Sequence, residues 1–195
     1  LDLMDQTADA LGRSRPVSAE VGKEYSRPFL KHLTWFFPGD QEQVLDTYMG
    51  FYHADVWREP RLYSGIPELL KRLKDKGYRT AILSDKREAF GVAELAFSKL
   101  GDSVDRALFF TDGMDPKPDP SGLQDMMGFL EVAPSETLFV GDSHRDIECA
   151  KRAGAWSGAA LWASVEPDLV LALKPDLKWE TVDDVGVTLD LGRTG

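Results

Sequence analysis

The sequence predicts an α/β fold in which helices cover both faces of a parallel β-sheet, together with a smaller, all-helical domain. Two patterns support this. From residue 61 onward, short apolar runs typical of buried strands alternate with segments of helical spacing. In residues 3–60 the apolar residues recur at helical spacing, without a convincing strand. Because strands that alternate with helices favour a parallel sheet, we expect a helical cap domain over 3–60 and an α/β core over 61–195.

The helical domain is predicted from two amphipathic stretches and the turn between them. The first stretch contains Phe29, Leu30 and Leu33. The second contains Val44, Leu45, Tyr48, Phe51 and Tyr52. The sequence Phe-Pro-Gly-Asp at 37–40 reads as a turn, in which Asp40 could cap the helix that follows.

The core domain is predicted to begin with a helix and then a buried strand. Ser64 can cap this helix and Pro67 suits its first turn. Gly77 ends the helix, residues 80–83 read as a strand, and Ser84 and Asp85 follow at its carboxyl end. The later predicted elements are helix 87–100, strand 107–111, a three-proline loop over 112–120, helix 121–132, strand 137–140, helix 145–153, strand 157–161, a helix near 166–173 and a short strand or extended segment near 177–182.

Charge and composition exclude several classes of protein. The chain has 33 Asp and Glu against 23 Lys and Arg. The resulting net charge of −10 argues against binding of nucleic acid or of an anionic membrane. The sequence contains no run of 18 apolar residues, so it predicts no membrane-spanning helix. The single cysteine, Cys149, cannot form an internal disulfide, and the first residues do not resemble a secretory signal. We therefore expect a cytoplasmic protein, and no feature indicates an oligomeric state.

Polar residues that could carry chemistry lie in three places along the predicted sheet. Ser84 follows one strand, Lys117 lies in the three-proline loop, and Asp142 and Asp146 follow the strand at 137–140. Each alone has an ordinary explanation, such as a helix cap or a solvated lysine. Ligands of parallel sheets nevertheless bind at the carboxyl ends of the strands, and we therefore expect these residues to meet in one site.

The residue types suit phosphoryl transfer. The Asp142 carboxylate is suited to Mg²⁺, and Gly141 before it allows a sharp turn and the close approach of a ligand. Asp146, four residues on, could orient a metal-bound water or the lysine. Lys117 supplies a positive charge and Ser84 a hydroxyl donor for the phosphoryl group. A two-metal nuclease would need a second acidic cluster, and a receiver domain would have its acids first and its lysine last.

The order serine, lysine, acids resembles the haloacid dehalogenase superfamily of phosphohydrolases. The matching sequences are ILSDK (82–86), DPKPDP (115–120) and FVGDSHRDIECAKRAGA (139–155). The resemblance is closest to the phosphoglycolate phosphatase-like branch, strong over 61–162 and weak over 3–60. It implies a Rossmann-like, doubly wound parallel sheet with a helical cap. It also implies Mg²⁺-dependent hydrolysis of a small phosphomonoester, of the phosphoglycolate or sugar-phosphate type, through an aspartyl-phosphate intermediate.

The resemblance also implies residue roles. Ser84, Asp85 and Lys117 are expected to bind phosphate, and Ser84, Lys117 and Asp146 to be catalytic. Asp142 matches the metal ligand of the family, and Asp146 matches the acid that supports this site, so we expect both at the Mg²⁺. The substrate would be a small phosphorylated metabolite enclosed by the cap. Candidate cap residues that could contact it are Lys31, His32, His53 and Arg58.

The nucleophile of this family is an aspartate in a first motif of the form Asp-x-Asp-Gly-Thr, and no stretch of this sequence matches it. Leu1-Asp2 resembles the end of that motif, so the nucleophile is expected upstream of residue 1. Asp2 and Asp5 lack a preceding strand and residues 187–194 lack the second acid, so neither is a good substitute. Loss of the central first strand would leave its two neighbours unpaired. A chain that truly starts at Leu1 is expected to have no phosphatase activity.

Other functions stay open at this point. A 2-haloacid dehalogenase would use the same fold without a metal, and the Gly-Asp-Ser-x-x-Asp cluster at 141–146 argues against it. A phosphosugar mutase shares all three motifs. A catalytically inactive binding or regulatory relative is supported only by the missing first motif. His144 could contact the site or be a solvated residue at the start of a helix.

Overall fold

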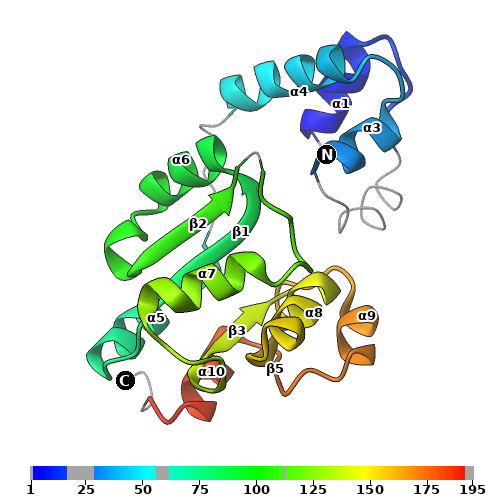
Figure 1. Ribbon diagram of the computed structural model, residues 1–195. Coiled ribbons are helices and arrows are strands. Elements are labelled where there is room, and N and C mark those ends of the chain that lie inside the picture. Colours follow the sequence, from blue (N-terminus) through cyan, green and yellow to red (C-terminus); the bar gives the residue numbers. More distant parts are fainter. Residues whose placement is uncertain (1, 17–28, 56–61, 112, 192–195) are drawn as a thin grey trace. The chain divides into compact units, whose positions relative to one another are not determined.

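The computed structural model describes residues 2–16, 29–55, 62–111 and 113–191, which belong to two compact units, Leu1–Glu59 and Pro60–Gly195 (Figure 1). Arg58 lies outside the described residues, as do the side chains of Lys31, His32 and His53. No helix among the described residues is long and apolar enough to cross a bilayer.

The first unit is helical and has its own core. It contains α1 (Asp2–Ala10), α3 (Phe29–Phe36) and α4 (Gln41–Asp55), and both α1 and α3 pack against α4. Its buried apolar residues are Met4, Ala8, Leu33, Phe37 and Val44. The predicted cap of α4 is confirmed, because Asp40 Oδ1 accepts hydrogen bonds from the backbone N–H groups of Glu42 and Gln43 at 3.0 and 3.3 Å.

The second unit begins with α5 (Ile66–Asp75), whose first residues differ in one detail from the prediction. Pro67 lies in the first turn, as predicted. Ser64 does not cap the helix, since Gly65 occupies the N-cap position with φ 88° and no side chain caps it. That φ lies in the left-handed region, which glycine adopts without strain.

The first pair of strands is parallel and contains a break in register. β1 (Ala81–Arg87) and β2 (Arg106–Phe110) are connected by α6 (Glu88–Ser98) and the 3₁₀-helix η1 (Gly101–Ser103). Ala81 lies opposite Arg106 and Ser84 opposite Phe109, and the regular register ends at Ser84. The break therefore falls at the residue predicted to bind phosphate.

The other three strands form a second parallel ladder in the order β3–β4–β5. They are β3 (Leu138–Gly141), β4 (Trp156–Ala160) and β5 (Leu177–Trp179). α7 (Ser121–Leu130) and the 3₁₀-helix η2 (Pro134–Glu136) precede β3. α8 (His144–Ala153) connects β3 to β4, and α9 (Pro167–Ala172) connects β4 to β5.

The segment after β5 corrects the sequence prediction. The short strand predicted near 177–182 is present but ends at Trp179, and the helix α10 (Val182–Thr188), which was not predicted, follows. A reciprocal capping box starts this helix: Thr181 Oγ1 accepts from the Asp184 N–H at 3.3 Å, and Asp184 Oδ2 accepts from the Thr181 N–H at 2.9 Å. Residues 187–188 are therefore helical, and residues 187–194 do not begin with a strand as a substitute first motif would require.

Helices cover both faces of the strands, which confirms the predicted α/β class. Successive residues of β3 show this, since Phe139 packs against the cluster formed by α7 and α8, and Leu138 against the cluster formed by α5 and α10. Figure 1 shows α7 and α8 beside each other over the strands, and the contacts between elements agree.

The two ladders share a core without being hydrogen-bonded to each other. Leu83 of β1 and Phe139 of β3 pack against the same cluster, which contains Leu123, Met127 and Cys149. Within the described part of the chain, however, β1 pairs only with β2, and β3 only with β4. Among the described residues, β1 and β3 thus each have one edge without a partner strand, and Val140 of β3 is 37% exposed. A strand inside a continuous parallel sheet would have both edges paired and its apolar side chains buried.

Candidate active site

The predicted site residues come from the carboxyl-end side of both ladders. Asp85 lies in the irregular part of β1, Lys117 in the loop between β2 and α7, and Asp146 in the first turn of α8. Asp146 and Asp85 each contact Lys117 directly. The folding of the core therefore brings together three of the residues predicted from the sequence.

Lys117 and Asp146 form an ion pair in a largely buried position. Lys117 Nζ donates to Asp146 Oδ1 at 2.6 Å, and the two side chains are 15% and 4% exposed. Burial alone would lower the pKa of Lys117, but the charges of Asp146 and Asp85 outweigh burial and raise it. Burial would likewise raise the pKa of Asp146, but Lys117 and hydrogen bonds from Ser143 lower it. Both groups are therefore charged at neutral pH.

The second oxygen of Asp146 is held by the capping box that starts α8. Ser143 donates to Asp146 Oδ2 from its hydroxyl at 2.7 Å and from its backbone N–H at 3.0 Å. The Asp146 N–H donates to Ser143 Oγ at 3.3 Å in return. Both carboxylate oxygens of Asp146 thus have partners, and the direction of the carboxylate toward Lys117 is fixed.

Gly141 is needed in this structure because Asp146 occupies the space beside it. A Cβ at residue 141 would lie 2.2 Å from Asp146 Cβ and 2.5 Å from Asp146 Oδ2. The backbone of Gly141 does not have a positive φ. Glycine is therefore required here not by the sharp turn that we expected, but by the close packing of Asp146 against the end of β3.

Asp142 differs from Asp146, because it is exposed and its carboxylate forms no hydrogen bond with any side chain among the described residues. Although Asp142 is exposed as a residue, neighbouring atoms partly desolvate its carboxylate, and this raises its pKa. The charges of Asp146 and Glu166 raise the pKa further, against the opposing effect of Lys117. A carboxylate that other negative charges destabilise is suited to a cation. The described residues contain no cluster of three or more His, Cys, Asp or Glu side chains able to hold a metal, so protein ligands for a cation would be few.

Asp85 holds the backbone of the lysine loop. Its Oδ1 accepts from the Lys117 N–H at 3.0 Å, and its Oδ2 lies 2.9 Å from a guanidinium nitrogen of Arg145. The same nitrogen of Arg145 donates to the Lys117 carbonyl. The peptide between Lys117 and Pro118 is cis. Sequence reasoning did not single out Arg145, whose partners are distant in the sequence.

Ser84 adjoins this network. Its hydroxyl accepts a hydrogen bond from the Lys86 N–H at 3.2 Å, and its side chain is half-buried at the register break of β1. Ser84 thus lies beside Asp85 with a hydroxyl that can donate to another group.

His144 and Glu166 form a second pair near Asp142. Glu166 Oε1 accepts from the His144 N–H at 3.1 Å and lies 2.5 Å from His144 Nδ1. The Glu166 side chain is 12% exposed and that of His144 30% exposed. His144 is therefore a partly buried, paired residue at the start of α8. Sequence reasoning overlooked Glu166, which follows β4 and has no local motif.

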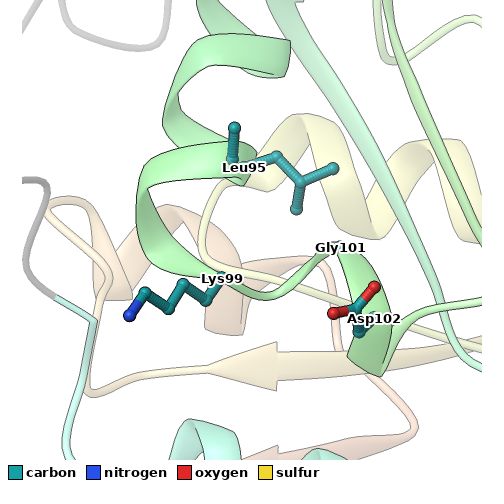
Figure 2. Close-up of a pocket in the computed structure, with 5 residues that line it drawn as sticks. Leu95, Lys99, Gly101 and Asp102 are labelled. Atoms are coloured by element: carbon teal, nitrogen blue, oxygen red, sulfur yellow. The ribbon is translucent and has the colours of Figure 1, made fainter.

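A surface hollow elsewhere in the second unit does not belong to this site. It is lined by Leu95, Ala96, Lys99, Gly101 and Asp102 (Figure 2). These residues lie at the end of α6 and in η1, which leads into the amino end of β2. The hollow thus lies near the amino end of β2, whereas the Lys117 loop leaves from the carboxyl end of the same strand.

Comparison with known proteins gives consistent matches. A family model described as haloacid dehalogenase-like hydrolase matches residues 4–160. Pyrophosphatase PpaX from Bacillus cereus (strain ATCC 10987 / NRS 248) is 30% identical over 154 residues, which are 78% of this chain and 71% of that protein. A haloacid dehalogenase-like family hydrolase from Streptococcus pneumoniae has a similar structure, with a TM-score of 0.85 at 18% identity over 96% of this chain and 89% of that one. A predicted phosphoglycolate phosphatase from Haemophilus somnus 129pt gives a TM-score of 0.80 at 18% identity over 95% and 88%.

Proposed function

Because the chain belongs to the haloacid dehalogenase-like hydrolases, we propose that it is a Mg²⁺-dependent phosphatase that acts on a small phosphomonoester. The observation that carries this proposal is the buried Lys117–Asp146 pair beside the exposed Asp142 carboxylate. Together they provide a fixed positive charge and a carboxylate suited to a cation. These are two of the groups that stabilise a transferring phosphoryl group.

Lys117 and Ser84 bind the phosphoryl group in this proposal. The Lys117 ammonium neutralises oxygen charge that develops during transfer, and Asp146 keeps it charged and directed. The Ser84 hydroxyl donates a hydrogen bond to another phosphoryl oxygen. Asp85 takes part through its backbone, because its carboxylate already serves Lys117 and Arg145. If the Asp85 carboxylate faced the phosphate directly, the two negative charges would repel each other. Its contacts with Lys117 and Arg145 avoid this repulsion.

The residues fit a magnesium ion with Asp142 as the direct ligand. Mg²⁺ commonly binds one or two carboxylates and completes its octahedron with water and substrate phosphate oxygens, which agrees with the few acidic side chains near Asp142. When bound, the ion would neutralise charge on the phosphoryl oxygens. Asp146 supports Asp142 through the added negative charge, and its role as a second ligand stays a prediction.

The nucleophile in this proposal is an aspartate on a strand that precedes residue 1 and pairs with both β1 and β3. Support comes from the two unpaired edges and from the first motif of the family. A carboxylate oxygen of this aspartate forms a bond to phosphorus as the bond to the leaving oxygen breaks. A second aspartate protonates the leaving oxygen and later takes a proton from the water that attacks the aspartyl phosphate. Phosphate is then released and the aspartate is regenerated.

In this proposal residues 3–60, which include most of α1 and all of α3 and α4, serve as the lid that encloses a small phosphorylated metabolite and sets specificity. A metabolite of this kind agrees with the net charge of −10, which disfavours polyanionic nucleic acid and anionic membranes as partners. We place the enzyme in the cytoplasm because its single cysteine cannot form an internal disulfide, which suits a reducing compartment.

The proposal is tested by phosphate release with and without Mg²⁺. The intact mass of the purified native protein comes first, since a mass above 21.7 kDa would reveal residues beyond these 195. That protein is then assayed with phosphoglycolate, sugar phosphates and pyrophosphate. Asp142→Asn should abolish Mg²⁺-dependent turnover, whereas Asp183→Asn, which changes an exposed acid on α10, should not.

Three outcomes would contradict the proposal. Normal turnover by Asp142→Asn would exclude Asp142 as the metal ligand. Metal-independent release of halide from a 2-haloacid would show a dehalogenase. A product that retains its phosphate would show a mutase.

A further inference from the structure

Arg145 connects the two ladders at the side of the site. It lies in the first turn of α8, directly after β3, and reaches Asp85 on β1, with 2.9 Å between a guanidinium nitrogen and Asp85 Oδ2. The side chains of Arg145 and Asp85 are only 13% and 23% exposed. Since β1 and β3 share no hydrogen bonds in the described part of the chain, this pair bridges a break in the sheet.

The same two side chains hold Lys117 from both sides of its backbone. Asp85 Oδ1 accepts from the Lys117 N–H at 3.0 Å, and Arg145 donates to the Lys117 carbonyl. One guanidinium nitrogen carries two N–H bonds and can serve both the Asp85 carboxylate and this carbonyl. Asp85 and Arg145 thus hold the backbone of Lys117 independently of the contact between its ammonium and Asp146.

We propose that Asp85 and Arg145 form a positioning pair that sets the place of the Lys117 ammonium for the reaction. This inference rests on the proposed function, because a lysine placed for phosphoryl transfer must be held more closely than one that only stabilises the fold. Neither residue touches the reacting atoms through its side chain. The pair acts through Lys117, and misplacement of a catalytic group by about 1 Å can cost about a hundredfold in rate.

The pair also predicts different effects for its conservative variants. Arg145→Lys keeps the charge but loses the planar guanidinium that contacts two acceptors from one nitrogen. Asp85→Asn keeps an oxygen that can accept from the Lys117 N–H but loses the charge that attracts Arg145. The lysine variant should therefore retain part of the function lost in Arg145→Met, and the asparagine variant should protect the Lys117 amide better than Asp85→Ala.

The test compares these variants in the full-length protein by two independent measurements. Hydrogen exchange at the Lys117 amide, followed by NMR, reports its bond to Asp85 whether or not the protein is an enzyme. Phosphatase turnover and inhibition by inorganic phosphate report placement of the ammonium. Arg106→Met is the matched control, because Arg106 is also a partly buried arginine, 25% exposed and 3.2 Å from Asp125, at the start of β2.

We expect Arg145→Met to speed exchange at Lys117 by about tenfold or more. We also expect it to lower kcat by about a hundredfold and to weaken phosphate inhibition, with Arg106→Met unchanged in all three. Because both residues act through Lys117, adding Asp85→Ala to Arg145→Met should cost far less than the two single effects combined.

Unchanged exchange and unchanged turnover in Arg145→Met would overturn the inference, as would fully additive effects in the double variant. Equal losses in Arg106→Met would also overturn it, since they would indicate general destabilisation. If the wild-type protein released no phosphate from any substrate and Lys117 exchange still followed the pattern above, the proposed function would fail and the pair would stand as a structural link. Arg145→Lys provides a milder variant if Arg145→Met does not fold.

Discussion

The Lys117 ammonium lies 2.6 Å from the Asp146 carboxylate, and the Asp146 side chain is only 4% exposed. A buried charge without its partner is costly, and removal of one member of such a pair typically destabilises a protein by about 3–5 kcal/mol. The pair is therefore a structural element of the fold as well as a candidate part of the site. Its stability and its role in turnover can be measured separately.

The first prediction concerns the pH dependence of this pair. Asp146 has a pKa lowered from its usual 3.8, so its contribution to stability is present above pH 3.8 and lost as the pH falls through the lower folded value. Lys117 has a pKa raised from 10.5, so its contribution is present below pH 10.5 and lost as the pH rises through the higher folded value. The contribution of the pair to the free energy of unfolding should therefore be constant from about pH 4 to 10.

Lys117→Met should reverse the acid side of this profile. Without the lysine, only the hydrogen bonds from Ser143 oppose burial, which is the largest single effect on the pKa of Asp146. We therefore expect that pKa to rise and the variant to become more stable as the pH falls from 7 to 4. At pH 7 we expect a loss of about 3–5 kcal/mol in urea unfolding without added Mg²⁺. Lys71→Met, which removes an exposed pair to Asp75 at 2.9 Å, is the control and should change neither stability nor its pH dependence measurably. A Lys117→Met profile parallel to wild type would disprove the coupling.

The second prediction is that Cys149 is chemically inert in the folded protein. Its thiol is fully buried and contacts the Asp119 carbonyl at 3.4 Å. Burial raises its pKa to about 11, against the opposing effect of Lys117. At pH 8 only about one thiol in a thousand would be a thiolate, the form that reacts. Iodoacetamide should therefore label Cys149 in urea and leave it unmodified in the native state, as mass spectrometry can show. Rapid native labelling would contradict this burial.

The elements that the sequence predicts well are those with a local signal. The strands at β3 and β4 and the helix α8 follow from apolar runs and helical spacing within about ten residues of chain. The site residues Lys117, Asp142 and Asp146 could be found because each follows a predicted strand or lies between prolines. The cap of α4 by Asp40 is likewise a local pattern, and the structure confirms it.

The features that sequence reasoning missed depend on distant partners or on one backbone angle. Arg145 lies in the first turn of α8 and Asp85 in β1, and no spacing rule relates the two residues. Glu166 and His144 are joined only through the fold. Whether Ser64 or Gly65 begins α5 is decided by the left-handed φ at Gly65, which a sequence does not display. α10 is the exception, since its Thr-x-x-Asp capping signal at 181–184 is visible in the sequence.

The third prediction tests the helix cap in the first unit. Asp40→Ala should remove the acceptor for two backbone N–H groups and destabilise α4 by about 1 kcal/mol. Asp40→Asn keeps an acceptor oxygen and should restore most of that loss, which makes it the matched control. Hydrogen exchange over 41–44 is the measurement. Equal protection in Asp40→Ala and wild type would show that these bonds do not contribute.

The fourth prediction follows from the packing of Asp146 against Gly141. In Gly141→Ala, the new Cβ would lie 2.2 Å from Asp146 Cβ, so α8 or its acid must move. We expect a loss of about 1–3 kcal/mol from overpacking, together with loss of turnover as Asp146 moves away from Lys117. The control is Gly128→Ala in α7, where a Cβ would meet nothing within 4 Å. Gly128→Ala should leave the free energy of unfolding unchanged or raise it by up to about 1 kcal/mol, because alanine favours a helix more than glycine does. Urea unfolding and phosphate release measure the two effects, and a Gly141→Ala protein with wild-type values in both would show that Asp146 does not need this space.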